Sequence, residues 1–266
     1  MRLGEKPGTV VGLAAAALLF VGGSVPGSVS GSSTGTRTVP PPTAAPTPTP
    51  TPSAPPLKDF QRPVTDCAKH KCVALTFDDG PGDHTARLLD MLAAADAKVT
   101  FFVVGEQAVH YPDLILREVE EGHEVGNHTW HHTQLDRSSI ARIHKEIDGT
   151  SKAIERILGF KPTLMRPPYG ATDARVAKIA KSRGLAEIIW SVDTDDWRDR
   201  NSSIVARRAI RGLRPGAIIL LHDIHPTTVD AVPAILKAAK KRGLTLATVT
   251  DLLGGNPKPG KKYMGE

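Results

Sequence analysis

Cysteine is scarce in this 266-residue chain, which contains only Cys67 and Cys72. Two thiolates alone cannot complete a zinc site, so a site built only from cysteine is excluded. Aromatic residues make up 5% of the chain, and no block of lysine and arginine is interleaved with them. This composition gives little support to nucleic-acid binding, and we expect no nucleic-acid partner.

Long apolar runs are missing as well. The apolar stretch at residues 10–21 is too short for a comfortable membrane span. It comes after Arg2 and Lys6 and before small residues, which is typical of a secretory signal peptide. We predict that residues 1–30 are a signal peptide; the alternative is an uncleaved N-terminal anchor, the only membrane link expected. The protein is then secreted, or associated with a bacterial cell surface or wall.

The two cysteines and the net charge are each open to two interpretations. In an exported protein Cys67 and Cys72 are predicted to form a disulfide, and a pair of free thiols is the alternative. The loop between them is short, so its closure should stabilise the fold only modestly. The formal net charge of +6 suits an anionic partner such as a wall polymer, or simply a soluble surface that is basic.

Composition also divides the chain into segments. Residues 31–63 are rich in Pro, Thr and Ser, cannot bury a core, and are predicted to be a disordered, extended linker. We place the folded domain at residues 64–253. Residues 254–266 are rich in Gly, Pro and Lys and are expected to form a flexible tail. No internal repeat is found, and we expect a monomer.

Within the domain, short apolar runs alternate with helical patterns. The expected strands are residues 72–77, 99–104, 124–126, 163–165, 186–192, 217–221 and 244–249. The expected helices are residues 85–95, 114–121, 140–158, 174–183, 203–213 and 229–241. Such alternation implies parallel strands joined by right-handed crossovers. The predicted fold is therefore α/β, a distorted or incomplete (β/α) barrel of about seven β/α units forming one catalytic domain.

Polar clusters follow five of these strands. They lie at residues 78–79, 127–132, 166–170, 193–197 and 222–223. In parallel barrels the reactive groups collect at the carboxyl ends of the strands, so the five clusters are expected to meet in one site.

A metal site is predicted within these clusters. His128 and His132 are four residues apart, so on a helical turn their imidazoles share one face, and Asp79 is the best third ligand. Two imidazoles and one carboxylate leave a position open for water, as in a catalytic site. One divalent ion is expected; zinc is favoured, and cobalt or nickel is the alternative. The intervening residues lack the glutamate of the zinc-protease helix motif, which argues against that class.

The five clusters together resemble the motifs of the polysaccharide deacetylases, carbohydrate esterase family four, with its NodB homology domain. The motifs read Thr-Phe-Asp-Asp-Gly-Pro at 76–81, His-Thr-x-x-His at 128–132, Arg-x-Pro-Tyr-Gly at 166–170, Asp-x-x-Asp-Trp at 193–197 and Leu-x-His at 220–222. The resemblance covers about residues 70–253. It implies a metal-dependent hydrolase that cleaves the linear amide bond of an acetylated carbohydrate.

The resemblance assigns the basic half of the mechanism to the first three motifs. Asp78 would be the general base that takes a proton from the attacking water. Arg166 would pair with Asp78 and orient it. Asp79, His128 and His132 would bind the metal.

The resemblance assigns the acidic half to the other motifs. His222 would protonate the leaving amine, and Asp196 would hydrogen-bond His222 and favour its cation. The backbone N–H of Tyr169 would stabilise the oxyanion, and the Tyr169 side chain would contact substrate. Trp197 and Leu220 would line the pocket for the acetyl methyl group.

Some assignments stay open at this point. Asp193 also belongs to the fourth motif and is the alternative partner of His222. The substrate is expected to be an N-acetylglucosamine polymer, either peptidoglycan or a chitin-like chain. An acetyl-xylan esterase acting on O-acetyl groups, and a non-catalytic protein that binds wall glycan, are the competing functions.

Overall fold

The computed structural model describes Leu57 and residues 62–265. The predicted signal peptide and most of the predicted linker fall outside these residues. None of the helices within them combines enough length and apolar character to cross a membrane.

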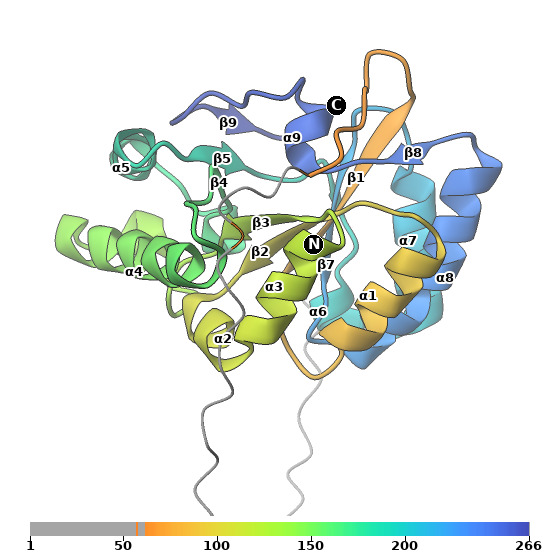
Figure 1. Cartoon of the computed structure of the whole chain (residues 1–266), viewed down its shortest axis with the longest axis horizontal. Helices are drawn as coiled ribbons and strands as arrows, with labels where there is room; N and C mark the ends of the chain where they lie inside the picture. The colour runs from red at the N-terminus through yellow and green to blue at the C-terminus, as the bar shows by residue number, and fades with distance from the viewer. Residues whose placement is uncertain (1–56, 58–61, 266) are drawn as a thin grey trace, which may run out of the picture. The chain divides into compact units, whose positions relative to one another are not determined.

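One parallel sheet organises the domain (Figure 1). Its order is β6 (Val192–Asp193), β7 (Ile218–His222), β1 (Cys72–Asp78), β2 (Thr100–Val103), β3 (Glu124–Asn127), β4 (Leu164–Met165), β5 (Ala186–Ile188) and β9 (Lys262–Tyr263), and β8 (Thr245–Leu246) pairs with the start of β1. All these pairs are parallel. The sheet curls into a half-barrel with helices packed on it, which confirms the predicted α/β class and distorted barrel.

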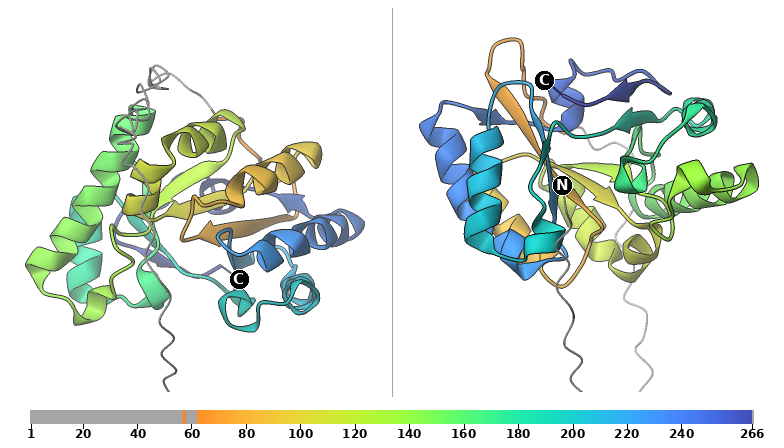
Figure 2. Two further views of the ribbon diagram at one scale, coloured as in Figure 1. Left: turned by 90° about the horizontal axis from the view of Figure 1, so that it is seen from below. Right: turned by 180° about the vertical axis from the view of Figure 1, so that it is seen from behind.

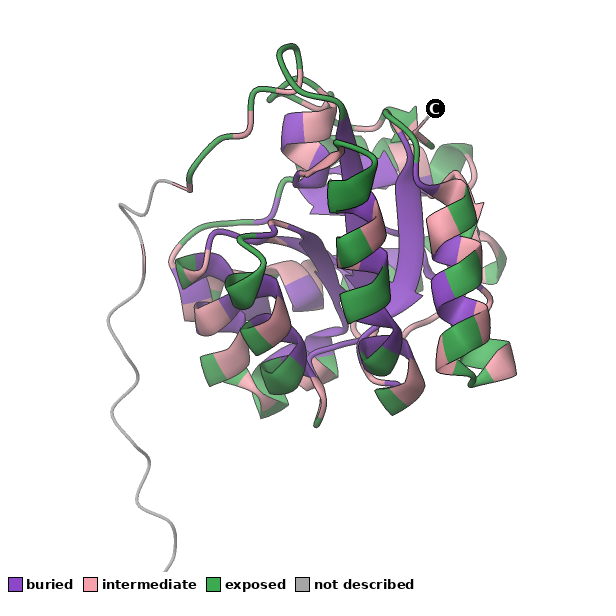
Figure 3. Ribbon diagram, turned by 90° about the vertical axis from the view of Figure 1, so that its right-hand side faces the viewer, coloured by how far each residue is buried: buried purple, intermediate pink, exposed green. Residues whose placement is uncertain are grey.

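Helices follow most of the strands. They are α1 (Thr85–Ala94), α2 (Gly105–His110), α3 (Pro112–Glu120), α4 (Ile140–Leu158), α5 (Ala174–Ser182), α6 (Asp196–Asp199), α7 (Ser202–Gly212), α8 (Pro226–Lys241) and α9 (Val249–Leu252), with 3₁₀ turns at Leu135–Arg137 and Pro168–Gly170. Figure 2 shows the helices around the outside of the sheet, and Figure 3 shows buried strands beneath helices whose outer faces are exposed.

Strand β1 is buried along its whole length because both of its faces are covered. Val73, Leu75 and Phe77 pack into the core cluster beneath the outer helices, whereas Ala74 packs inside the barrel. The period of two along a strand therefore turns Asp78 inward with Ala74. In register, Asp78 lies beside His222 of β7.

The single strand expected over residues 186–192 is two strands, which corrects the prediction. β5 pairs with β4 and β9, whereas β6 pairs with β7 at the other edge of the sheet. Between them the Ile189 N–H donates to Tyr263 and the Ser191 N–H to Ile218. At the crossing, Ser191 is the single polar residue within Ile188–Val192, which is too weak a signal to predict that the run divides into two strands.

The C-terminal residues also differ from the expected flexible tail. Lys262–Tyr263 adds strand β9 to the edge of β5. A strand of two residues is too short to show an alternation of apolar and polar residues in the sequence. Its pairing depends on whether a sheet edge is available rather than on its own composition.

The entry of the chain into the domain is held in two places. Cys67 and Cys72 form a disulfide with a Cα–Cα distance of 5.5 Å. Arg62 forms two hydrogen bonds of 2.7 Å with the buried Asp251.

Candidate active site

Three side chains from two strand ends converge on one point. Asp79 follows β1, and His128 and His132 lie in the loop after β3. The Nε2 atoms of His128 and His132 lie 3.5 and 3.4 Å from Asp79 Oδ1. One donor atom from each residue lies within 4.8 Å of the others. The predicted ligands are thus brought together.

The hydrogen bonds around these residues suit a cation. His128 Nδ1 lies 2.7 Å from the Arg166 carbonyl oxygen, which accepts only from N–H, so the Nε2 lone pair faces Asp79. Asp79 Oδ1 is buried and has no hydrogen-bond partner among the described residues. Burial would raise the pKa of Asp79, but His128, His132 and His222 together hold it below its ordinary value. A carboxylate and two imidazole lone pairs around one point fit a divalent metal ion.

The loop that holds the two histidines is irregular, which corrects the expected helical turn. Thr129 and His132 have left-handed φ angles of 67° and 53°. The loop is held by Glu146 of α4, a fully buried carboxylate whose Oε2 accepts the N–H groups of Trp130 and His131 at 3.0 and 2.8 Å. The loop geometry therefore depends on a helix that follows it in the chain.

Asp78 is held by the most buried arginine of the site. Arg166 Nη1 donates to Asp78 Oδ1 and to Thr76 Oγ1, both at 2.7 Å. Arg166 is 0% exposed, and its guanidinium lies 4.2 Å from the centroid of the Phe102 ring. The second oxygen, Asp78 Oδ2, lies 3.6 Å from His128 Nε2, so it faces the metal ligands.

A tight turn lets two adjacent carboxylates face the same site. Asp79 has a left-handed φ of 73°, which reverses the outward direction that alternation along β1 would give it. Gly80 follows, where a Cβ would lie 2.4 Å from both carboxylate oxygens of Asp223. The reversal of direction therefore occurs at Asp79 itself.

His222, at the end of β7, is oriented by Asp196. His222 Nδ1 lies 2.8 Å from Asp196 Oδ1, and the His222 backbone N–H donates to Asp196 Oδ2 at 2.8 Å. Burial lowers the pKa of His222, but Asp196, helped by Asp78 and Asp79, raises it to about 9. Asp193, the alternative partner, accepts the Asp195 N–H instead.

A cavity of about 350 Å³ is lined by Asp78, Asp79, His128, His132 and His222. Its wall includes Tyr169, Trp197 and Leu220, and also Asp193. Tyr169 and Trp197 are 67% and 49% exposed, which leaves their rings accessible to a ligand. Tyr169 has a left-handed φ of 60°, and its ring lies 4.6 Å from that of His132.

Sequence reasoning missed two residues of this site. Trp190 lines the cavity and lies 5.6 Å from the Arg166 guanidinium, but it sits in the unrecognised break between β5 and β6. Glu146 lies within the helix expected over residues 140–158, and no role was predicted for it. Its signal was its spacing: it lies between Ile143 and Ile147, on the apolar side of that helix.

The comparisons with known proteins agree with this geometry. The polysaccharide deacetylase family matches residues 65–188. The chain is 43% identical to the peptidoglycan-N-acetylglucosamine deacetylase PgdA of Listeria monocytogenes over 201 residues, covering 75% of this chain and 42% of that protein. It is 36% identical to a chitooligosaccharide deacetylase of Bradyrhizobium over 213 residues, covering 74% of this chain and 97% of the relative.

A solved structure is similar in fold and sequence. It is a family 4 acetyl xylan esterase from Clostridium thermocellum in complex with a cobalt ion, with a TM-score of 0.68 and 34% identity over 73% of this chain and 98% of that one. The chain spans about two fifths of the length of PgdA, but nearly all of the chitooligosaccharide deacetylase. On these matches, the chain belongs to the polysaccharide deacetylase family.

Proposed function

We propose that this protein is a secreted, metal-dependent deacetylase that hydrolyses N-acetyl groups of N-acetylglucosamine polymers, either peptidoglycan or a chitin-like chain. The observation that carries the proposal is the arrangement of two differently held groups around the Asp79–His128–His132 cluster. On one side Asp78 is bonded to Arg166, and on the other His222 is bonded to Asp196. Amide hydrolysis needs such a base and such an acid.

Asp79, His128 and His132 would hold one divalent ion, with zinc favoured over cobalt or nickel. When bound, the ion supplies an acidified water and polarises the acetyl carbonyl. Asp78 removes the proton from the attacking water with Oδ2, while Arg166 fixes Oδ1. Because Asp78 is buried, bulk solvent does not compete with the attacking water for its carboxylate.

His222 completes the reaction by protonating the leaving amine. Asp196 keeps the imidazole protonated at neutral pH and points Nε2 into the cavity. The backbone N–H of Tyr169 donates to the developing oxyanion, and such a preorganised donor contributes typically about 3–4 kcal/mol to the transition state. Trp197 and Leu220 contact the acetyl methyl group, and Tyr169 contacts the sugar.

The relatives support N-deacetylation, since PgdA and the chitooligosaccharide deacetylase are named for N-acetylated substrates or sugar chains. The similar acetyl xylan esterase keeps O-deacetylation as a second candidate. The same base, acid and metal ligands could hydrolyse an N-acetyl or an O-acetyl group. The two functions are therefore distinguished by the substrate that is cleaved, not by the residues of the site.

The test is acetate release from chitooligosaccharides, peptidoglycan and acetylated xylan by one preparation. We expect release from the N-acetylglucosamine substrates, and loss of most turnover in Asp78→Asn with metal binding retained. Release from acetylated xylan alone would favour the esterase. Glycan binding without acetate release, after zinc or cobalt is added, would favour the non-catalytic function.

A further inference from the structure

The positive charge of this chain is concentrated in one stretch. Residues 201–250 contain eight Lys and Arg and two Asp, a net charge of +6, which equals that of the whole chain. Of the two carboxylates, Asp223 is buried and Asp230 pairs with Arg87 at 2.7 Å. The remainder of the chain is neutral in sum. A generally basic surface therefore does not explain the charge.

The fold gathers five of these eight cations at the end of the barrel opposite the active site, whereas Arg208 pairs with Asp195 and Asp199. Helices α7 and α8 both run away from the site, so their last turns lie at that end (Figure 1). Arg211 belongs to the last turn of α7, Lys240 and Lys241 belong to that of α8, and all three are exposed. Arg214 follows α7, and Arg242 follows α8.

Backbone contacts join these ends to the disulfide loop. The Thr245 N–H donates to the Lys71 carbonyl, and the Gly216 N–H donates to Cys72. The Arg242 guanidinium donates to the Leu213 carbonyl at 2.8 Å, which ties the end of α8 to that of α7. The exposed side chains gathered here are the basic end: Lys71, Arg211, Arg214, Lys240, Lys241 and Arg242.

Local stabilisation does not account for the whole cluster. Lysine and arginine in the last turn of a helix complement the helix dipole, which explains Arg211, Lys240 and Lys241. Lys71 and Arg214 lie outside helices. Among the described residues, none of the six forms an ion pair with a carboxylate. The like charges of the basic end therefore lie together without carboxylates to neutralise them. An external anion would neutralise them.

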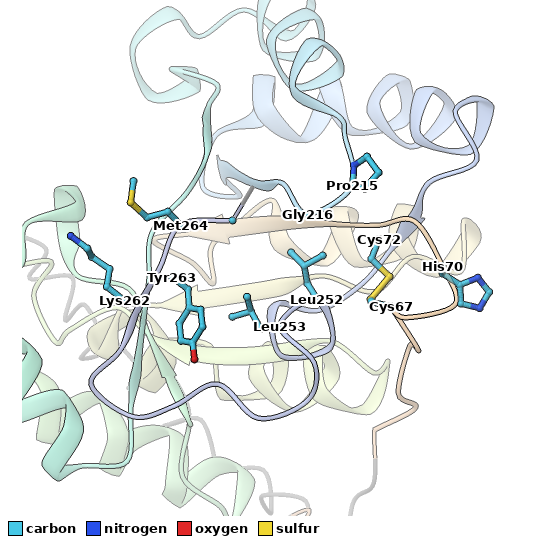
Figure 4. A pocket seen from close by; sticks show the side chains of 11 residues that line it. Cys67, His70, Cys72, Pro215, Gly216, Leu252, Leu253, Lys262, Tyr263 and Met264 are labelled. Carbon is cyan, nitrogen blue, oxygen red and sulfur yellow. A yellow bond between two sulfur atoms is a disulfide. The ribbon is translucent and has the colours of Figure 1, made fainter.

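The surface beside the basic end is hollowed. A cavity of about 800 Å³ lies between the ends of α1 and α8, with Lys237 and Lys240 on its wall and an aliphatic lining that includes Leu236, Leu244 and Leu246. On the other side of the disulfide loop lies a second cavity of about 490 Å³, which His70 and Lys262 line (Figure 4). A flexible chain can enter such hollows, whereas a flat bilayer surface cannot.

We propose that the basic end binds a linear polyanion of phosphodiester-linked polyols, with anionic groups on the lysines and arginines and the carbon spacers in the aliphatic hollow. The active site lies at the opposite ends of the strands, so a polymer held here leaves it open. The bound polymer would retain the enzyme within an anionic cell wall.

The test measures binding of the full chain to soluble poly(glycerol phosphate) at several salt concentrations. Single-stranded polyanions give a slope of about −0.7 in log K against log salt per neutralised phosphate, so six contacts predict about −4. In the variant R214E/K240E/K241E the slope should become shallower, from about −4 to about −2, and the affinity should fall by at least about tenfold. The affinity of the neutral variant R214Q/K240Q/K241Q for the polymer should lie between those of the wild type and the charge-reversal variant.

The matched control is K145E/K152E/K178E, which changes three exposed lysines of α4 and α5 and the net charge equally. Equal loss in the control, or unchanged binding in the first variant with its circular dichroism intact, would overturn the proposal. Tighter binding to phosphatidylglycerol vesicles than to the polymer, lost in the same variant, would assign the surface to a membrane instead.

Acetate release from a short chitooligosaccharide separates this proposal from the proposed function. The charge-reversal variant should retain wild-type release because it changes no residue of the active site. If the wild-type protein released no acetate but bound the polymer, only the proposed function would fail.

Discussion

Replacing Glu146 tests whether a buried carboxylate holds the metal-binding loop. In Glu146→Ala the N–H groups of Trp130 and His131 lose their acceptor, and Arg142 Nη2 loses a 2.7 Å ion pair. Each hydrogen bond to a charged group is worth about 1.5–3 kcal/mol, so we expect the free energy of unfolding to fall by about 3 kcal/mol or more. His128 and His132 flank the released segment, and such supporting residues typically change metal affinity by about 10–100-fold.

The assay measures the Co²⁺ dissociation constant from the visible absorption of the protein–cobalt complex, with a competing chelator, beside thermal unfolding. Glu146→Gln retains one oxygen that can accept both backbone N–H groups, so it should recover much of the cobalt affinity. Glu155→Ala on the same helix, where Glu155 has only a 3.9 Å contact with Lys161, is the matched control. A folded Glu146→Ala protein that binds Co²⁺ as tightly as the wild type would refute the reasoning.

Three further predictions concern other parts of the domain. His222 acts as an acid only while protonated, and Asp196 raises its pKa to about 9, so activity should fall above that pH. Asp196→Asn should move this basic limb of the kcat/KM profile to lower pH; an unmoved limb would contradict the pairing. Gly80→Ala places a methyl group 2.4 Å from the Asp223 carboxylate and should lower the urea midpoint of unfolding, and an unchanged midpoint would count against the crowded turn. Replacing both cysteines by serine opens a loop with a sequence separation of 5 and should cost about 2 kcal/mol of stability by calorimetry, with no loss of acetate release; a much larger cost would contradict the modest contribution expected of so short a loop.

The barrel and the members of the site were predictable because both leave local traces in the sequence. Strand β1 is covered on both faces, so it is an apolar run interrupted only by Thr76, and Asp78 and Asp79 end it. The same pattern of apolar run and polar end recurs at His222. Parallel strands then place all such ends at one edge, which requires no knowledge of individual contacts.

The remaining features depend on contacts between distant segments. The four-residue spacing of His128 and His132 suggested a helical turn, but the loop conformation is set by Glu146, 14 residues beyond His132. The break that creates β5 and β6 depends on which edge of the sheet each half can reach, and the composition of residues 186–192 does not encode that edge. Trp190, which lines the cavity, lies in that break.

Acetate release from N-acetylglucosamine oligomers, measured before chelation, after chelation and after zinc is restored, tests the central claim most directly. Wild-type protein should release acetate, lose this activity on chelation and regain it with zinc, while Asp78→Asn should bind zinc and stay nearly inactive. Acetate release that persists after complete removal of metal, or near-normal release by Asp78→Asn, would contradict the account.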